Sequence, residues 1–328
     1  MRRLALALLL LLLARHSSAQ AATRTADTLI TSEVRRQLDL LSATTSISAV
    51  HLGSGRMVEV RADQPMNTMS TIKIPIMLLA YRDAEAGRLN LDERITLREE
   101  DMRGGTGLLK RLAPGATVTY RDLIDQMIIT SDNTATEALI VKLGMDRING
   151  MLRELGFRET RLVQTISQFF RNSAAALSPE RAAWSDVQIF RAPPVTALSA
   201  AQVAAKRFAF AVDSTTWLGR STAREMTTLL EGIYTAKYAN RANSAAMMNH
   251  LFGQFYTTRL PATLRYRSGV RIAHKTGDFP PTSGSDVGVI EYPGGVLVIS
   301  VYTNANRGDF AQLELTIGRI AELLVNRW

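Results

Sequence analysis

Three short polar motifs carry side chains that could cooperate in acyl transfer. Ser70 and Lys73 form a Ser-x-x-Lys motif, which occurs once in the chain and uses one of only six lysines. Residues three apart on a helix share a face, so the hydroxyl and the amine could meet. A serine needs a base to attack a carbonyl, and a lysine provides one only where burial or another cation lowers its pKa. Taken alone, such a motif is more often a serine helix cap followed by an exposed lysine.

Two further motifs favour a catalytic role for Ser70 and Lys73 over the helix-cap interpretation. Residues 131–133 read Ser-Asp-Asn, and residues 274–277 read His-Lys-Thr-Gly at the close of a predicted strand. Separately, the first is typical of a helix boundary and the second of a strand end before a turn. In this order the three motifs match a known set of catalytic motifs, which consists of a serine nucleophile with a lysine, Ser-Asp-Asn and Lys-Thr-Gly. The sequence therefore predicts an acyl-transfer enzyme.

Hydrophobic periodicity indicates which elements position these motifs. Helical spacing predicts helices over residues 26–41, 70–88, 120–130, 134–143, 146–155 and 310–325. Strands are predicted over residues 47–52, 57–60, 272–275, 287–292 and 296–302. Strands and helices near both ends flank a helical middle, which predicts an α+β fold. We expect a sheet domain of residues 21–62 plus 214–328, and an inserted helical domain of residues 63–213.

Composition and charge exclude several classes of protein. Of the 328 residues, 46% are hydrophobic and 21% are charged, as in ordinary folded proteins. The formal charge of +9 comes from scattered arginines without a basic block, so no nucleic-acid partner is expected. Cysteine is absent, and the histidines beyond the leader, His51, His250 and His274, lie far apart in the sequence. We therefore predict no metal and no other cofactor.

The first residues are typical of a secretory signal peptide. Arg2 and Arg3 precede an apolar run over residues 4–14, and small residues follow at 17–22. Eleven apolar residues are too few to cross a bilayer, so we expect residues 1–20 to be removed and no stable membrane anchor to remain. The mature chain would then carry 36 basic and 30 acidic residues. We predict a secreted or periplasmic protein that acts as a monomer.

These motifs together resemble those of class A β-lactamases, within the penicillin-recognising serine enzymes. The resemblance covers residues 70–75, 112–115 (Leu-Ala-Pro-Gly), the neighbourhood of Ser131, 160–162 (Thr-Arg-Leu) and 274–277. It implies a five-stranded antiparallel sheet with N- and C-terminal helices packed on it, plus an all-helical domain. The active site would lie between the two parts, and the substrate would be a small β-lactam or a cell-wall peptide-like molecule.

The resemblance also implies a role for each motif residue. Ser70 would be the acylated nucleophile and Lys73 its base. Ser131 would pass a proton to the departing nitrogen, while Asn133 would hold Lys73 and a substrate amide. Lys275 and Thr276 would bind the substrate carboxylate. The oxyanion would lie between the backbone N–H groups of Ser70 and of Asp278, the residue after Gly277.

One position departs from the family pattern. Ile166 stands where class A enzymes carry the glutamate that activates water for deacylation, and an isoleucine cannot accept a proton. The residues that usually brace this loop by ion pairing are missing at Val163 and Gln164, and the chain is longer than usual over residues 163–213.

Three explanations of this departure remain open. The insertion could return another carboxylate, for which Glu180, Asp186 and Asp213 are the candidates. Lys73 could instead serve both steps, as in a D-Ala-type peptidase or an esterase. Deacylation could also be slow, which would make the protein a penicillin-binding protein rather than an efficient hydrolase.

Overall fold

The computed structural model describes residues 23–328, and its largest sheet has six strands in the order β1-β3-β2-β11-β10-β9. Their bounds are β1 Thr25–Ala26, β2 Thr44–His51, β3 Arg56–Val60, β9 Arg271–Phe279, β10 Ser283–Tyr292 and β11 Gly295–Asn304. The five longer strands are antiparallel, as expected, but β1 adds a sixth that pairs in parallel with β3. A two-residue strand is too short to show alternation, which is why periodicity did not reveal it. Strand β9 lies at the edge of this sheet.

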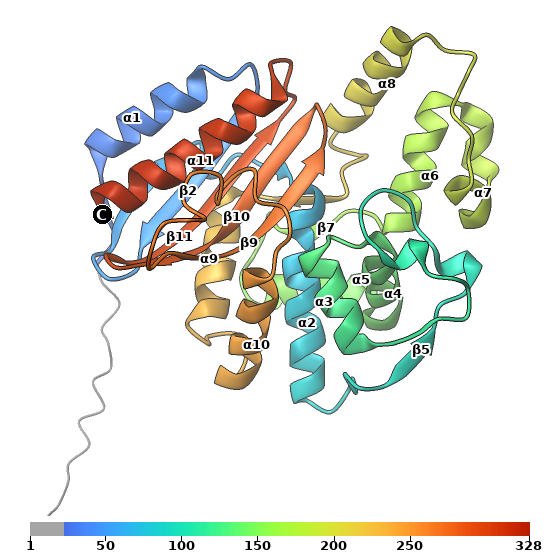
Figure 1. Cartoon of the computed structure of the whole chain (residues 1–328), viewed down its shortest axis with the longest axis horizontal. Coiled ribbons are helices and arrows are strands. Elements are labelled where there is room, and N and C mark those ends of the chain that lie inside the picture. Colours follow the sequence, from blue (N-terminus) through green and yellow to red (C-terminus); the bar gives the residue numbers. More distant parts are fainter. Residues whose placement is uncertain (1–22) are drawn as a thin grey trace, which may run out of the picture.

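Helices cover both faces of the large sheet. On one face, α1 (Thr28–Asp39) and α11 (Phe310–Arg327) lie side by side (Figure 1). Their buried residues, including Val34, Leu38 and Ile317, form one core with Ile47 and Ile299 of the sheet. On the other face lie α9 (Ala223–Tyr234) and α10 (Arg241–Phe252). These two helices were not among those predicted from the sequence, although the N-cap residues Thr222 and Asn240 precede them.

The rest of the described chain is mainly helical. Its helices are α2 Lys73–Glu85, α3 Tyr120–Ile129, α4 Asn133–Leu143, α5 Met145–Glu154, α6 Ile166–Leu177, α7 Asp186–Phe190 and α8 Ala200–Val212. Short 3-10 turns are η1 Met69–Ile72, η2 Glu99–Asp101, η3 Leu109–Arg111 and η4 Pro179–Ala183. There are also two small sheets. One has three strands in the order β4 (Met66–Asn67), β8 (Gly219–Ser221) and β7 (Arg161–Leu162), and the other pairs β5 (Arg94–Thr96) with β6 (Thr117–Thr119).

Helix α2 begins later than the sequence predicted. Ser70 lies in η1, and α2 starts at Lys73, whose N–H donates to the carbonyls of Ser70 and Thr71. The nucleophile candidate is therefore in a tighter turn that leads into the helix. A single core runs from the face of the large sheet that α9 and α10 cover through α2, α3 and α4. Met69 and Ile72 of η1 belong to this core, so η1 is held where the sheet meets the helices.

The long segment after Leu162 folds as α6, η4, α7 and α8. Figure 1 shows α6 and α7 beside the helical part and α8 extending toward the large sheet. Within residues 23–328 no helix combines the length and apolar character that a bilayer crossing requires. The predicted signal peptide lies outside the described residues.

Candidate active site

A cavity of about 470 Å³ lies where η1, the start of α4, α6 and the end of β9 come together. Four of the predicted site residues line it, and these are Ser70, Ser131, Asn133 and Asp278. The other four, Lys73, Lys275, Thr276 and Gly277, are buried next to the lining residues rather than exposed in the cavity. The three motifs, which span about two hundred residues of sequence, therefore meet in one place.

The backbone around Ser70 is held in an uncommon conformation. Met69, immediately before it, has φ +46°, and Ser131 on the facing loop has φ +55°. Residues other than glycine adopt such angles at a free-energy cost, and the surrounding packing must enforce them. A Cβ on Gly277 would lie 2.4 Å from the carbonyl oxygen of Thr68. Glycine at this position therefore lets β9 approach η1 closely and brings Asp278 next to Ser70.

Lys73 is fully buried, and its amine is surrounded by acceptors. Its Nζ lies 2.8 Å from the carbonyl oxygen of Ser131, 3.1 Å from Ser131 Oγ and 2.8 Å from Asn133 Oδ1. Burial, together with the charge of Lys275, holds the pKa of Lys73 well below its usual range. The amine is thus able to exist in its neutral form and to exchange a proton with the Ser131 hydroxyl. Its contacts run to Ser131 and Asn133, rather than to Ser70 as the helical spacing suggested.

Lys275 and Thr276 supply a buried cation and a free hydroxyl on β9. The Nζ of Lys275 donates to the carbonyl oxygen of Thr276 at 2.9 Å, and burial lowers the pKa of Lys275 to about 8 despite the opposing charges of Asp278 and Asp286. Within the described chain, Thr276 Oγ1 is buried without a hydrogen-bond partner. An unpartnered donor next to a cation suits a carboxylate ligand.

The glycine-containing loop 104–107 is fixed to the Ser-Asp-Asn motif. Asn133 Nδ2 donates to the carbonyl oxygen of Gly104 at 2.9 Å, and Thr106 Oγ1 donates to that of Ser131 at 2.6 Å. A Cβ on Gly105 would lie 2.7 Å from Asn133 Nδ2, so only glycine permits this approach. The loop therefore lies at the edge of the cavity, where Gly105 and Thr106 line it.

The α6 side of the cavity is apolar. Ile166, 1% exposed, begins α6 and lines the cavity together with Phe169 and Phe170. The ring centroid of Phe169 lies 5.4 Å from that of Phe210 on α8 and 6.0 Å from that of Phe279 at the end of β9. This aromatic cluster closes the space between α6, α8 and the sheet edge. Water would find few hydrogen-bond partners against these side chains.

The three candidate carboxylates of the insertion do not line this cavity. Glu180 bonds to its neighbour Ser178, and Asp213 bonds to Thr215 on an exposed turn. The hypothesis that the insertion returns a catalytic carboxylate is therefore not supported by the position of these residues. The acidic residues that do line the cavity are Asp278 and Glu314, and both pair with the buried guanidinium of Arg259.

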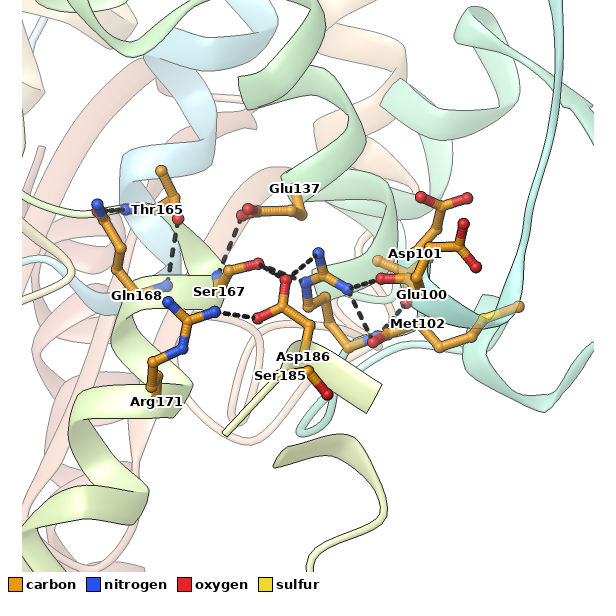
Figure 2. Close-up of polar contacts among 12 residues, drawn as sticks. Glu100, Asp101, Met102, Glu137, Thr165, Ser167, Gln168, Arg171, Ser185 and Asp186 are labelled. Carbon is orange, nitrogen blue, oxygen red and sulfur yellow. Dashed lines mark hydrogen bonds and ion pairs between the residues drawn. The ribbon is translucent and has the colours of Figure 1, made fainter. Parts of the chain in front are cut away.

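Asp186 instead ties the insertion to the site loops. Figure 2 shows its carboxylate next to Arg171 and Ser167, and Oδ1 accepts from Arg171 at 2.7 Å. Its Oδ2 accepts from Arg103 at 3.0 Å. Ser167 Oγ donates to the same carboxylate at 3.0 Å and accepts from Arg103 Nε at 2.7 Å. Arg103 begins the loop that contacts Asn133. The network thus braces α6 and this loop together, where the brace expected at Val163 and Gln164 is missing.

Sequence reasoning missed the aromatic cluster and Arg259. Phe169 and Phe170 were visible as a pair, and Phe279 stands two residues after the Lys-Thr-Gly motif, but nothing in the sequence indicated that these rings meet. Arg259 stands in an irregular segment, where its buried pairing with Asp278 has no local signal.

The histidines are engaged separately, and within residues 23–328 no group of three or more potential ligands could hold a metal ion. His274 Nδ1 lies 2.9 Å from Asp286, whereas His250 contacts Asp125 and Tyr81.

Comparison with known proteins gives a consistent picture. A model of the β-lactamase enzyme family matches residues 29–328. β-Lactamase L2 of Stenotrophomonas maltophilia is 32% identical over 111 residues, which is 34% of this chain and 36% of that protein. β-Lactamase PSE-4 of Pseudomonas aeruginosa is 26% identical over 123 residues, or 37% of this chain and 42% of that protein. The alignments thus span well under half the length of these curated relatives.

Solved structures share the fold along almost their whole length. A β-lactamase from Sphaerobacter thermophilus superposes with a TM-score of 0.71 and 24% identity, covering 90% of this chain and 95% of that one. PBP-A has a TM-score of 0.73 at 20% identity, covering 94% and 98%. A leucine-to-glutamate variant of PBP-A, solved as an acyl-enzyme complex with penicillin G, has a TM-score of 0.71 at 20% identity, covering 93% and 97%. These likenesses establish the predicted sheet-plus-helical-domain fold.

Proposed function

Because the chain belongs to the β-lactamase enzyme family, we propose that it is a serine acyl-transfer enzyme. It opens β-lactam amides by acylation of Ser70 and hydrolyses the resulting acyl-enzyme slowly. The observation that carries this proposal is the contrast within one cavity. Ser70 and Ser131 line the cavity, and Ser131 contacts the buried amine of Lys73, whose pKa is lowered, whereas Ile166 occupies the position of the deacylating glutamate. Acylation therefore has its base, and deacylation lacks the usual one.

The acylation step follows from the positions of these groups. Neutral Lys73 takes the proton of Ser70, either directly or through Ser131, and Ser70 Oγ forms a bond to the lactam carbonyl carbon. The oxyanion is held by the backbone N–H groups of Ser70 and Asp278. When the carbon–nitrogen bond breaks, Ser131 donates a proton to the ring nitrogen and regains one from Lys73. The substrate carboxylate is bound by Lys275 and Thr276.

Deacylation would need a water molecule on the opposite side of the ester. Ile166, Phe169 and Phe170 offer no proton acceptor there, and general-base assistance contributes about 10² to 10⁴-fold. We therefore propose a long-lived acyl-enzyme. The solved acyl-enzyme of the PBP-A variant supports the idea that this fold can hold such an intermediate.

The test follows product and adduct together. Purified protein is mixed with a chromogenic cephalosporin, and both colour release and intact mass are recorded, with Ser70→Ala as the control. We expect one adduct per molecule, slow release of further product, and no adduct on Ser70→Ala. Rapid turnover without accumulation of the adduct would show an efficient β-lactamase. Turnover of D-Ala peptides or simple esters, with rapid release, would favour the peptidase or esterase alternative. Absence of any adduct would overturn the mechanism.

Export belongs to the same proposal. The leader pattern of residues 1–20 supports a secreted or periplasmic protein, where β-lactams and cell-wall peptides are accessible. Fractionation of cells that express the full chain, followed by N-terminal sequencing, tests it. A full-length cytoplasmic product would contradict export.

A further inference from the structure

A second hollow of about 700 Å³ adjoins the Ser70 cavity, between α8 and the turn that joins β9 to β10. Arg207 on α8 and Pro280 line both spaces, so the two are adjacent. The inner cavity holds the reacting groups. The outer hollow is lined mainly by small and apolar side chains of α8, such as Val203 and Ala204, and by the turn. A substrate attached to Ser70 could therefore extend into it.

Two guanidinium groups flank the outer hollow, and each rests on an aromatic ring. Arg207 Cζ lies 5.6 Å from the ring centroid of Phe279, and Arg307 Cζ lies 3.9 Å from that of Phe208. Stacking on a ring orients a guanidinium but leaves its N–H edge free for an anion. Both arginines are exposed, and in the part of the chain that the structure describes neither forms an ion pair.

The negative charges nearby do not compensate these cations. Among the described residues, no acidic side chain lines the outer hollow. Asp278 and Glu314 line the inner cavity, but both are paired with Arg259, which is only 3% exposed. The path from Ser70 outward therefore passes an apolar region around Phe169 and Phe279 and ends at two uncompensated positive charges.

We propose that Arg207 and Arg307 bind an anionic group on the acyl portion of the substrate. The enzyme then reacts preferentially with acyl donors whose side chain is aromatic and negatively charged. The aromatic part packs against Phe169 and Phe279, and the anion accepts hydrogen bonds from the guanidinium edges. This inference rests on the proposed acylation of Ser70, and it names the class of acyl donor. Lys275 and Thr276 bind the other carboxylate of a penicillin, so the two anion sites are separate.

Three penicillins that differ by one substituent provide the test. Penicillin G, carbenicillin and ampicillin carry hydrogen, a carboxylate and an ammonium, respectively, on the carbon next to the phenyl ring. The second-order rate constant of Ser70 acylation is measured for each by intact mass. Exposed ion pairs contribute little free energy each, so we expect carbenicillin to react about 3- to 10-fold faster than ampicillin at low ionic strength. Added salt should reduce this preference.

Variants of the two arginines test whether these residues cause the preference for carbenicillin over ampicillin. Arg207→Gln should remove most of the preference, and Arg207→Glu should reverse it. Arg307→Gln should give a smaller change in the same direction. The matched control is Lys206→Gln, because Lys206 is the neighbouring cation on α8 but donates to the carbonyl oxygen of Ala176 and lines neither space. It should leave the three rate constants in the same ratio.

The outcomes separate this inference from the proposed function. If none of the three penicillins forms an adduct, the acylation mechanism itself fails. If all three acylate Ser70 at similar rates, or if the order is the same in Arg207→Glu as in the unmodified protein, acylation stands and the anion-binding role of these arginines is refuted.

Discussion

The two sides of the Ser70 cavity differ sharply in chemistry. On the motif side, which comprises Lys73, Ser131, Asn133 and Lys275, the polar groups are buried, Lys73 is hydrogen-bonded to Ser131 and Asn133, and both lysines have lowered pKa values. The α6 side, formed by Ile166, Phe169 and Phe170, offers hydrocarbon surface instead. In a two-step acyl transfer these sides act at different times, because attack on the substrate needs the first and attack by water needs the second. Formation and hydrolysis of the ester can therefore be lost independently.

Removing the base of the motif side should have the largest effect. Lys73→Met keeps the length of the side chain but cannot accept a proton, so the rate of acylation by a chromogenic cephalosporin should fall about 10³-fold. Stopped-flow mass or colour measurements check this. Lys142→Met, on the outer side of α4 where Lys142 pairs with Glu93, is the control and should acylate normally. Equal rates in Lys73→Met and the unmodified protein would mean that another base serves Ser70.

Adding a base to the α6 side should accelerate deacylation and leave acylation to the motif side. Ile166→Glu places a carboxylate at the start of α6, and the rate of deacylation should rise about 10²-fold. The adduct lifetime is measured by mass after removal of excess penicillin. Ile166→Gln introduces similar size and polarity without a comparable proton acceptor, so it should leave the lifetime nearly unchanged. A similar acceleration in both variants would indicate that better water access, rather than base catalysis, limits hydrolysis.

The pH profile should report the lysines of the motif side. Acylation should fall at low pH because protonated Lys73 cannot act as base, and it should fall above pH 8 because Lys275, with a pKa of about 8, loses the charge that binds the carboxylate. Arginine keeps its charge at this pH. At one pH unit above the midpoint of the alkaline decline, Lys275→Arg should therefore retain about tenfold more of its maximal rate than the unmodified protein does. The normalised profile of kcat/KM tests this. An alkaline limb that stays at the same pH in Lys275→Arg would assign it to another group.

The smallest effect is expected from the brace that links the two sides. Asp186→Asn weakens the pairing with Arg103 and Arg171, which should lower the free energy of unfolding by about 1 to 2 kcal/mol and slow acylation a few-fold. Thermal unfolding and acylation rates measure the two effects. Glu180→Gln, in the same insertion but on the surface, should change neither. A large fall in deacylation alone would instead give Asp186 a catalytic part.

Much of the motif side could be predicted from the sequence. Its residue types are chemically specific, and their order along the chain matched a family whose fold the structure reproduces. The long strands and amphipathic helices also followed from periodicity. Strand β1 was missed because it is two residues long, and α10 because its apolar residues do not gather on one face. Helix α9 was also missed, although Met226, Leu229, Leu230 and Ile233 stand at helical spacing and could have indicated it. The individual roles of Ser70, Ser131 and Lys275 stay predictions until the variants are measured.

The α6 side could be predicted only in part. The sequence determined that Ile166 cannot accept a proton, because that property belongs to the side chain alone. Only the tertiary structure decided that Phe169, Phe210 and Phe279 form one cluster, that Asp186 acts as a brace, and that Arg207 lines the cavity that contains Ser70. Contacts between distant segments depend on how elements pack, and no local pattern encodes them. The buried state of Lys73 likewise arises from packing, and it is chiefly burial that lowers its pKa, which the proposed role as a base requires.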